Sequence, residues 1–530
     1  MSTHRIDRLI TTADEAVARI KDGMTVACGG FAGSAHPEAL TSALERRFLS
    51  SGTPEGLTLV YGAGQGDRGS KGLNHLGHKG LIRRVIGGHY GLAPKIGALV
   101  FANQVEAYNF PQGVVCQLYR DIAAGRPGCI THVGLGTFID PLFGGGRLNS
   151  CTTEPLIERV ELAGRTWLFY KALPIDVALI RGTSADPFGN ICMTDETLVG
   201  EVLAMAQAAH NSGGIVLAQV KRIADHPIKP AHVRVPGTLI DAIVVASGDE
   251  HDQTYAEVWN ETYTNPASND PTAASFPLLE PMPLDERRII ASRACDELSS
   301  GAIANLGIGM PEGVARMAAE RGLLNHVTLT VESGPIGGMP AGGLSFGASV
   351  HPEAIIDQPS QFDFYDGGGL DYAALGAAQV DRHGNVNVSR FDSRLAGVGG
   401  FVNISQNAKQ VVFCGTLTSS GLLVAVERGQ LRIVREGAKR KFLDHVEQLS
   451  FSGQVAREMK RKVMYVTERA VFQLNDEGLE LIEVAPGIDI ETQILSQMDF
   501  RPIIRNVKPM PDTAFAQGPT NLKRSIAPTA

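Results

Sequence analysis

The chain has 530 residues and a mass of 56.4 kDa, more than the roughly 250–300 residues at which single cores stop growing, so we expect two domains. Hydrophobic residues make up 43 % and charged residues 20 %, a composition that excludes a disordered or fibrous chain. The formal net charge of −8 disfavours a nucleic-acid partner, which would call for a basic surface.

Cysteine usage and hydrophobic runs indicate the compartment. The 7 cysteines are scattered and never form a CxxC pair, so we expect a reducing environment without disulfides or a thiolate metal site. The first twenty residues lack the apolar core of a signal peptide, and no apolar run approaches the roughly 18–20 residues that span a bilayer. These features predict a cytoplasmic protein that does not associate with membranes.

The N-terminal pattern is typical of an α/β unit. Thr12 and Glu15 form a capping-box signature that predicts a helix over 12–22. A β-prone run over 24–28 then leads into a glycine loop over 29–33, after which a second helix begins. The expected local structure is a strand, a glycine loop and a helix.

A possible dinucleotide motif comes next. Residues 64–69 (GQGDRG) match G-x-G-x-x-G and follow a strand predicted over 57–61. The acidic residue expected about 20 positions later is missing, because no Asp or Glu follows the motif before Glu106. Arg83 and Arg84 would suit NADP, but glycines interrupt the segment that should be the motif's helix. We therefore disfavour a dinucleotide cofactor.

Three histidines lie close together in the same region, at positions 75, 78 and 89. The spacing of His75 and His78 would allow a metal pair on a helix, but Gly77, Gly80 and two further glycines break any single helix that could present all three. We interpret them as ordinary loop histidines and expect no metal.

Two landmarks recur along the chain. The strand and glycine pattern at 57 returns at 327, an offset of 270 residues. A second pattern, which runs from an aspartate through an apolar run to D and then G-N, begins at Asp176 and returns at Asp371, an offset of 195 residues. We infer two homologous domains, of which the first holds about 75 more residues between these landmarks.

The expected fold class is α/β, with two homologous open doubly wound domains and largely parallel sheets. Continuous apolar runs over 240–246 and 410–413 favour strands that helices cover on both faces. The predicted organisation is an N-terminal domain over 1–262 with an insertion at roughly 65–170, a linker rich in proline, asparagine and serine over 263–283, a C-terminal domain over 284–507 and a loosely ordered tail over 508–530.

The segment most informative about chemistry begins at 327. A predicted strand delivers Glu332 to its C-terminal end, where open α/β sheets bind ligands, and a glycine-rich loop follows. Glycines leave backbone N–H groups accessible to an oxyanion, and a carboxylate among them can attack an acyl carbon without a general base, because it is already ionised near pH 7. Local sequence leaves the alternative, a solvated loop acid, equally open. Ser333 lacks the second glycine of a G-x-S-x-G elbow, which disfavours a serine hydrolase.

Several longer motifs resemble one family. The run GMTVACGGFAGSAHP at 23–37 resembles the N-terminal signature of family I coenzyme A transferases. The runs ANLGIGMPEGVA, TVESGPIGGMPAGGLSFGAS and GVGGFVNISQNAKQVVFCGT are similar to the second half of the fused branch that contains the acyl-CoA:acetate/3-ketoacid and propionate CoA-transferases. The resemblance covers about residues 5–500. It accounts for the internal repeat, since the two halves are separate subunits in related enzymes.

The resemblance implies an activity. CoA would pass from a short-chain acyl-CoA, such as acetyl-, propionyl-, butyryl- or acetoacetyl-CoA, to a free carboxylate such as acetate, by ping-pong kinetics. Glu332 would carry first an acyl-glutamyl anhydride and then a glutamyl-CoA thioester. No metal and no cofactor beyond CoA are implied. The partners would be small molecules, the site would lie in the interdomain cleft, and the chain would form a homodimer or homotetramer.

The resemblance also implies site residues. In the loop 397–400, Gly399 or Gly400 would supply backbone N–H groups to the oxyanion. Gln379 resembles a glutamine near the reactive carboxylate, although a buried glutamine that caps a loop is an open alternative. Glu312, at a predicted helix start, is interpreted as an acid that compensates the helix dipole. The expected substrate-binding residues are Gly29, Gly30, Phe31, Gly64 and Gln379.

Two other functions remain open at this point. A CoA thioester hydrolase would use the same glutamate but let water intercept the intermediate, so loss of the thioester would need no acceptor acid. A non-catalytic CoA-binding protein on the same fold is the other alternative. The retention of Glu332 within its glycine loop speaks against it.

Overall fold

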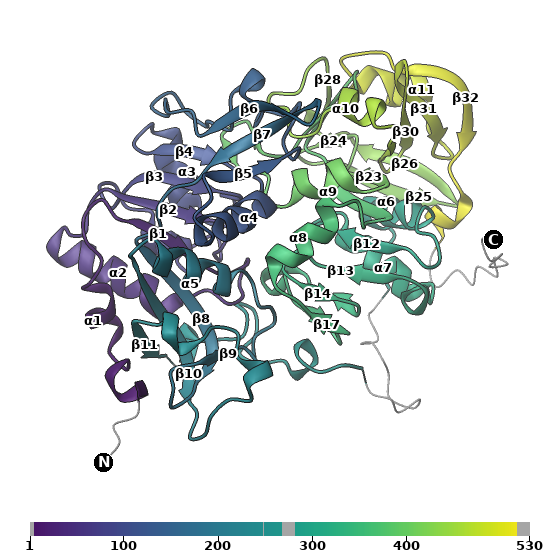
Figure 1. The fold of residues 1–530 in the computed structure, drawn as a ribbon. Helices are drawn as coiled ribbons and strands as arrows, with labels where there is room; N and C mark the ends of the chain where they lie inside the picture. The colour runs from purple at the N-terminus through teal and green to yellow at the C-terminus, as the bar shows by residue number, and fades with distance from the viewer. Residues whose placement is uncertain (1–4, 247, 268–280, 517–530) are drawn as a thin grey trace.

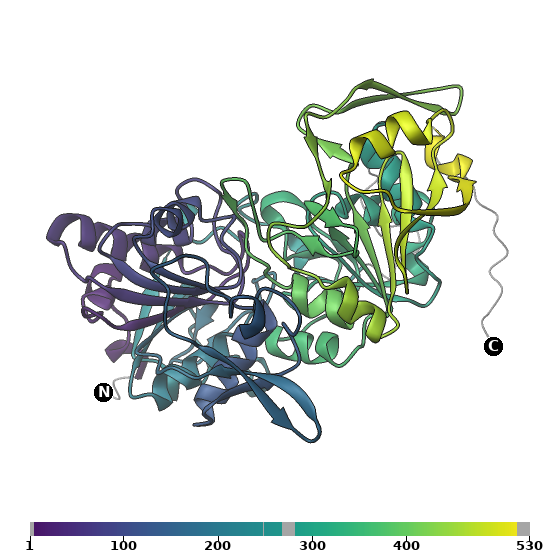
Figure 2. The ribbon, with the colours of Figure 1, turned by 90° about the horizontal axis from the view of Figure 1, so that it is seen from above.

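The computed structural model describes residues 5–246, 248–267 and 281–516. It contains two α/β domains side by side, the first in purple to teal and the second in green to yellow (Figure 1). Seen from above, the two halves of the chain occupy opposite sides of the molecule and meet along its centre (Figure 2).

The first domain is built on a sheet with the strand order β11-β10-β8-β1-β2-β3-β4. Neighbouring strands along this order are parallel, and β9 is added antiparallel to β8. β8 is buried along its whole length, as expected for a central strand covered on both faces. The strands are β1 (Thr25–Cys28), β2 (Leu57–Tyr61), β3 (Ile82–Gly87), β4 (Glu106–Asn109), β8 (Val177–Ala185), β9 (Ile191–Cys192), β10 (Ile215–Ile223) and β11 (Ala242–Val245).

Helices and a small second sheet complete this domain. The helices are α1 (Ala13–Val17), α2 (Glu38–Ser51), α3 (Pro94–Phe101), α4 (Gln112–Ala123) and α5 (Val202–Asn211). The antiparallel sheet has the order β5-β7-β6, with β5 (Gly128–Thr131), β6 (Ile157–Leu162) and β7 (Arg165–Lys171). The predicted insertion at 65–170 thus contains β3, β4, α3, α4 and nearly all of this small sheet.

The second domain is built on a sheet with the order β17-β14-β13-β12-β18-β23-β29-β30-β31-β32. The central strands from β13 to β29 are parallel, whereas β14, β17, β30 and β31 join by antiparallel pairing. The strands are β12 (Ile303–Leu306), β13 (Thr328–Thr330), β14 (Pro335–Ile336), β17 (Ala354–Ile355), β18 (Tyr372–Gly376), β23 (Gln410–Cys414), β29 (Lys462–Val466), β30 (Ala470–Asn475), β31 (Gly478–Val484) and β32 (Ile503–Pro509).

The remaining elements of this domain are short. Its helices are α6 (Glu286–Cys295), α7 (Glu312–Glu320), α8 (Gln358–Asp366), α9 (Phe401–Asn407), α10 (Gly453–Glu458) and α11 (Ile490–Gln493). The small sheets pair β15 (Met339–Pro340) with β16 (Ser349–Val350), β19 (Gln379–Asp381) with β20 (Val386–Asn387) and β28 (Phe442–Leu443), β21 (Arg390–Phe391) with β22 (Arg394–Leu395), β24 (Thr418–Ser419) with β27 (Lys439–Arg440), and β25 (Leu423–Glu427) with β26 (Gln430–Arg435).

The strand pairing agrees with the repeat inferred from the sequence. In the first domain β8 lies beside β1 and β1 beside β2, all parallel. In the second domain β18 lies beside β12 and β12 beside β13 in the same way. The recurring landmarks therefore lie on equivalent strands, and the prediction of two open α/β domains with largely parallel sheets is confirmed.

The predicted helix boundaries are accurate at their starts. Thr12 accepts a hydrogen bond from the N–H of Glu15 and completes the capping box of α1, but this helix ends at Val17 and not at residue 22 as predicted. The side chain of Asp285 likewise caps α6 through the N–H groups of Arg287 and Arg288.

The domain boundaries fall partly outside the described residues. Of the linker predicted over 263–283, Tyr263 and Met282 are buried, and residues 268–280 lie outside the described part. The tail expected to be loosely ordered from 508 begins inside β32. Met510 and Phe515 are buried against the second domain, so residues 508–516 belong to that domain, and 517–530 lie outside the description. Among the described residues, no helix is both long and apolar enough to cross a lipid bilayer.

Candidate active site

Strand ends from both domains line one cavity of about 410 Å³. The first domain contributes Phe31 and Gly64, and the second contributes Glu332, Asn305 and the loop 397–400. Most of the other lining side chains are apolar or glycine. The cavity lies between the two domains at the carboxyl ends of parallel strands, the position at which open α/β sheets bind ligands.

Glu332 follows β13 and is the buried acid of this cavity, with 8 % of its surface exposed. Its Oε2 accepts a hydrogen bond of 3.1 Å from Nδ2 of Asn305, which lies on the neighbouring strand β12. Burial raises the pKa of Glu332 above its ordinary value, and the bond from Asn305 opposes that rise only in part. The carboxylate is thus poorly solvated and points into an apolar space, so the alternative of a solvated loop acid is wrong.

The two residues after Glu332 fix the loop that carries it. The hydroxyl of Ser333 donates a hydrogen bond of 2.6 Å to the carbonyl of Gly347. Gly334 has φ 129°, and a Cβ at that position would clash with the carbonyl oxygen of Ile356. The E-S-G sequence is therefore a structural requirement, because the serine ties the loop down and only glycine fits the turn.

The glycine loop 397–400 distinguishes its two candidate donors. The N–H of Gly399 donates to the carbonyl of Gly88 at 2.7 Å, whereas the N–H of Gly400 has no partner within the described residues. A Cβ on Gly400 would lie 3.5 Å from Cγ of Glu332. Gly400 is therefore the residue of this loop whose N–H is not engaged and whose backbone lies beside the carboxylate.

The first domain holds this glycine loop in position through a residue that the sequence did not reveal. Asn109, at the end of β4, accepts a hydrogen bond of 3.0 Å from the N–H of Val398. Its side-chain amide donates to the carbonyls of Gly87 and Gly88 at 2.8 and 2.6 Å. Asn109 is completely buried, and it links the strand ends of one domain to the loop of the other.

Only part of the turn 29–31, whose residues we expected to bind substrate, reaches the cavity. Phe31 lines the cavity, and its ring lies 5.6 Å from that of Phe346 across the domain interface. Gly29 and Gly30 do not line the cavity. Both are buried behind Phe31, where Gly30 has φ 130° and a Cβ would lie 2.9 Å from Oε1 of Gln65. These glycines therefore allow the tight turn that presents Phe31 and have no contact with the cavity.

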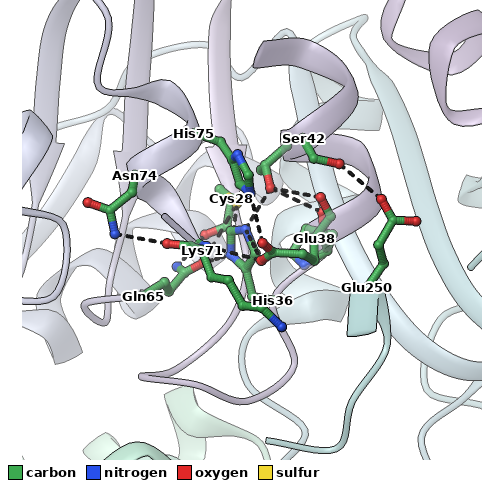
Figure 3. A network of polar contacts seen from close by, with 12 residues as sticks. Cys28, His36, Glu38, Ser42, Gln65, Lys71, Asn74, His75 and Glu250 are labelled. Atoms are coloured by element: carbon green, nitrogen blue, oxygen red, sulfur yellow. Dashed lines mark hydrogen bonds and ion pairs between the residues drawn. The ribbon is translucent and has the colours of Figure 1, made fainter. Parts of the chain in front are cut away.

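A buried network of polar side chains supports that turn (Figure 3). His36 shares a hydrogen bond of 2.6 Å with Oε1 of Gln65, and His75 shares one of 2.7 Å with Glu38. Burial raises the pKa of Glu38, but the hydrogen bonds from His75 and Tyr255 and the charge interactions of the two histidines outweigh it and lower that pKa to about 2. The network is internal to the first domain and forms the base of the Phe31 turn.

The three histidines singled out in the sequence have separate positions. His75 and His78 both contact the carboxylate of Glu45, whereas His89 lines the cavity beside Gly64. Burial and then the positive charge of Arg68 lower the pKa of His89 to about 4, so its ring is neutral at pH 7. Gly64 is required there, because a Cβ would clash with the His89 ring.

Two predicted residues lie outside the cavity wall. Gln379 does not line it, because its amide donates to Glu447 at 2.7 Å while its oxygen accepts hydrogen bonds from Asn387 and the N–H of Glu447. The structure thus favours the alternative of a glutamine that caps a loop. Glu312 begins α7 and accepts a hydrogen bond of 2.8 Å from the N–H of Gly309.

Two basic residues of the cavity had no signal in the sequence. Lys441 borders it beside Gly415, and burial lowers the pKa of Lys441 to about 8. Arg68 borders it on the first domain and is exposed. Across the described ranges, no group of three or more histidine, cysteine or acidic side chains is arranged to hold a metal ion.

These features define an enzyme site, with a buried carboxylate and a glycine loop between two homologous α/β domains. A family profile described as "Coenzyme A transferase" matches residues 10–246. Acetate CoA-transferase YdiF of Escherichia coli K12 is 42 % identical over 501 residues, which cover 93 % of this chain and 92 % of that protein. Caffeate CoA-transferase of Acetobacterium woodii is 43 % identical over 513 residues, covering 96 % and 97 %.

The structural comparison agrees. The crystal structure of the YdiF acyl-CoA transferase of E. coli O157:H7 described as a thioester complex with CoA superposes with a TM-score of 0.90 at 39 % identity, covering 97 % of this chain and 98 % of that chain. The chain belongs to the coenzyme A transferase family, and it is an enzyme that transfers CoA. The resemblance read from the sequence motifs is confirmed.

Proposed function

We propose that the enzyme transfers CoA from a short-chain acyl-CoA to a free carboxylate such as acetate, by ping-pong kinetics through covalent intermediates on Glu332. The observation that carries this proposal is the position of the Glu332 carboxylate, which is buried in the interdomain cavity beside the unengaged N–H of Gly400. The relatives named for acetate and caffeate transfer support the same class of reaction.

The first half-reaction has two steps. A carboxylate oxygen of Glu332 attacks the thioester carbonyl, and the C–S bond breaks to give an acyl-glutamyl anhydride and CoA thiolate. The thiolate then attacks the glutamyl carbonyl, which releases the original acid as its carboxylate and leaves a glutamyl-CoA thioester. An acceptor carboxylate reverses both steps with its own acyl group. This series of reaction steps needs no cofactor beyond CoA.

Each attack creates a tetrahedral oxyanion. The N–H of Gly400 is the donor that we assign to it, because the N–H of Gly399 is already bonded to the carbonyl of Gly88. Loss of one such donor typically costs about 10²–10³ in rate. The amide of Asn305, which holds Oε2 of Glu332, orients the attacking oxygen.

Burial of Glu332 serves the chemistry in two ways. A poorly solvated carboxylate is a stronger nucleophile than one in water, and the energy of placing it there is supplied by folding. The apolar lining, which includes Phe31 and Phe346, limits the access of water to the anhydride. Apolar walls of this kind fit a short acyl chain, and they argue against the hydrolase alternative.

The decisive experiment is mass spectrometry of intact protein and peptides after mixing the enzyme with propionyl-CoA and no acceptor. A CoA adduct on the peptide that contains Glu332, discharged by acetate with formation of acetyl-CoA, would support the covalent mechanism. Loss of thioester without an acceptor would favour the hydrolase. No adduct and no acyl exchange with several acyl-CoAs would leave a CoA-binding protein.

A further inference from the structure

Helix α9 begins directly after Gly400 and packs against α8 between the two domains (Figure 1). Gly400 is the N-cap of α9, and its carbonyl accepts the first hydrogen bond of the helix, from the N–H of Ile404 at 3.0 Å. A shift of α9 therefore moves Gly400 with it. Because we assign the N–H of Gly400 to the oxyanion, the contacts that hold α9 in place matter for the reaction.

One face of α9 carries three buried amide side chains. They follow the spacing i, i+3 and i+4, which places residues next to one another on a helix. Each accepts a hydrogen bond from the first domain, so this face attaches the helix to that domain. The bonds reach Asn403 from the N–H of Gly113 at 3.2 Å, Gln406 from the N–H of Gly134 at 2.9 Å and Asn407 from Nε2 of His132 at 2.7 Å.

Asn403 connects three helices. It lies on α9 and accepts from Gly113 of α4, and its Nδ2 donates to both carboxylate oxygens of Asp366 on α8, at 2.9 and 3.0 Å. Burial raises the pKa of Asp366 to about 7, and the hydrogen bond from Asn403 opposes that rise. Asn403 is itself completely buried. Its amide is used as a donor and as an acceptor at once, and an aspartate at this position would lose the donor.

The surroundings of this pair leave little room for a shift. A Cβ on Gly113 would lie 2.5 Å from Nδ2 of Asn403 and 2.6 Å from the ring of Phe362, and a Cβ on Gly400 would lie 3.3 Å from the same ring. Phe362 is one turn before Asp366 on α8. Loss of the bond between Asn403 and Asp366 would leave buried polar groups unsatisfied, and movement of α8 or α9 would relieve that cost.

We propose that Asn403 is a positioning residue of the transfer reaction, and that its bonds to Gly113 and Asp366 hold the N–H of Gly400 in place for the oxyanion. This inference rests on the proposed function. Asn403 does not line the cavity, so it acts through Gly400 and touches no reacting atom. A misplacement of about 1 Å can cost about 10²-fold in rate. A change at position 403 should therefore slow the chemical step and leave substrate binding nearly unchanged.

The first test exchanges the two groups of the pair. Asn403→Asp keeps the acceptor for Gly113, removes the donor to Asp366 and places two carboxylates together. It should lower kcat by roughly 10–100-fold, with KM for propionyl-CoA and acetate within about twofold of the wild type. Addition of Asp366→Asn restores the bond with donor and acceptor exchanged and the charge of the pair unchanged, so this double variant should recover kcat to within about fivefold. Asn403→Ala, which removes both bonds without an added charge, is the second variant and should also be slow.

Asn385→Asp is the matched control. Asn385 lies in the same domain, donates to Asp381 at 2.9 Å and accepts from the N–H of Gly453 at 2.9 Å, but it does not line the catalytic cavity. This control should lose stability and keep kcat within about twofold of the wild type. The proposal is overturned if both variants at Asn403 keep the wild-type kcat, if their loss of kcat only equals that of the control, or if the exchanged pair stays as slow as Asn403→Asp.

Two further measurements separate this inference from the proposed function. Amide hydrogen exchange over 398–407 in the unliganded proteins should be faster in Asn403→Asp than in the wild type, and should be restored in the exchanged pair. Equal exchange in all three would overturn the inference. In a single turnover with propionyl-CoA, the CoA adduct on Glu332 should form more slowly in Asn403→Asp. An adduct that forms at the wild-type rate would also overturn the inference, whereas no adduct in the wild type would count against the proposed function.

Discussion

At the scale of single residues, the cavity holds the carboxylate of Glu332 at a cost in stability. Glu332 is buried with one side-chain hydrogen bond, from Asn305, and its pKa is raised. A group whose folded pKa is raised destabilises the folded state wherever it is ionised, and this effect disappears below the ordinary value of 4.5. The same carboxylate that we assign to catalysis should therefore be visible in a stability measurement.

Glu332→Gln should abolish transfer and raise Tm by roughly 1–3 °C at pH 7. The gain should vanish as the pH falls below 4.5, because the wild-type carboxyl is then neutral. Scanning calorimetry at pH 7 and pH 4 gives the comparison. A variant less stable than the wild type at pH 7 would show that the carboxylate stabilises the fold.

Glu332→Asp should also be severely impaired in transfer, since the shorter side chain misplaces the attacking oxygen by about 1 Å.

A second buried carboxylate should control the pH dependence of stability. Glu201 precedes α5, and neither of its oxygens has a hydrogen-bond partner within the described residues. Burial raises its pKa to about 8. Between pH 4.5 and 8 the folded state binds a proton that the unfolded state releases, so this group's contribution to stability falls as the pH rises through that window.

Glu201→Gln should therefore match the wild type near pH 5 and exceed its free energy of unfolding by about 1–3 kcal/mol at pH 8.5. Urea unfolding at the two pH values measures this difference. Equal pH dependence in both proteins would place the titration elsewhere. Glutamine is the matched replacement because, like the protonated acid, it is neutral and of nearly the same volume.

At the scale of elements, the glycine loop 397–400 separates two roles that the sequence could not. Gly399 has φ 52° and its N–H is bonded to the first domain, whereas Gly400 has an ordinary φ of −81° and an unengaged N–H. The resemblance to the family implied that one of them serves the oxyanion. Only the hydrogen bonding of the two N–H groups, which depends on contacts from a different domain, distinguishes the pair.

Substitution of each glycine by alanine should give different results. Gly399→Ala should lower the free energy of unfolding by about 1 kcal/mol, because its left-handed backbone is unfavourable for alanine. Gly400→Ala should affect transfer more than stability, since the new Cβ would lie 3.5 Å from Cγ of Glu332, and the buried ring of Phe362, at 3.3 Å, would need to shift only slightly. Unfolding curves and kcat measured on the two variants would contradict this assignment if the effects were reversed.

The elements themselves were largely predictable. Strand periodicity and caps located β2, β13 and the starts of α1 and α7 to within a few residues, because their signals are local. The resemblance implied the roles that we assign to Glu332 and to Gly399 or Gly400. Asn109, Arg68 and Lys441 gave no signal, because each acts through contacts with distant parts of the chain. Gln379 was placed near the nucleophile on resemblance, but its hydrogen bonds to Glu447 and Asn387 hold it in a loop.

At the scale of the whole molecule, the two domains are joined through polar contacts at the glycine loop 397–400, beside Glu332. Asn109 is the central contact, since it bonds to Gly87, Gly88 and Val398 while completely buried. Removal of a buried side chain with several hydrogen bonds leaves those partners unsatisfied. We therefore expect removal of the Asn109 side chain to weaken the domain interface and to displace the loop that carries Gly400.

Asn109→Ala should destabilise the protein by about 2–4 kcal/mol and lower kcat more strongly than it changes KM for acyl-CoA. Asn211→Ala is the control, because Asn211 is exposed and makes a single hydrogen bond to the carbonyl of Ala123. Thermal unfolding and steady-state kinetics of both variants are the measurements. Full activity in a destabilised Asn109→Ala protein would mean that the contact serves folding alone.

The equivalence of β2 and β13 has a consequence for how such an enzyme changes over time. With the offset of 270 residues, Gly62 after β2 occupies the position that Glu332 occupies after β13. The two copies of one ancestral unit therefore have different roles. One copy carries Glu332, which we assign to catalysis, and the other supplies a wall of the cavity through Phe31. We therefore expect mutations in the first copy to alter which acids are accepted, while the chemical step that we assign to Glu332 in the second copy is inherited unchanged.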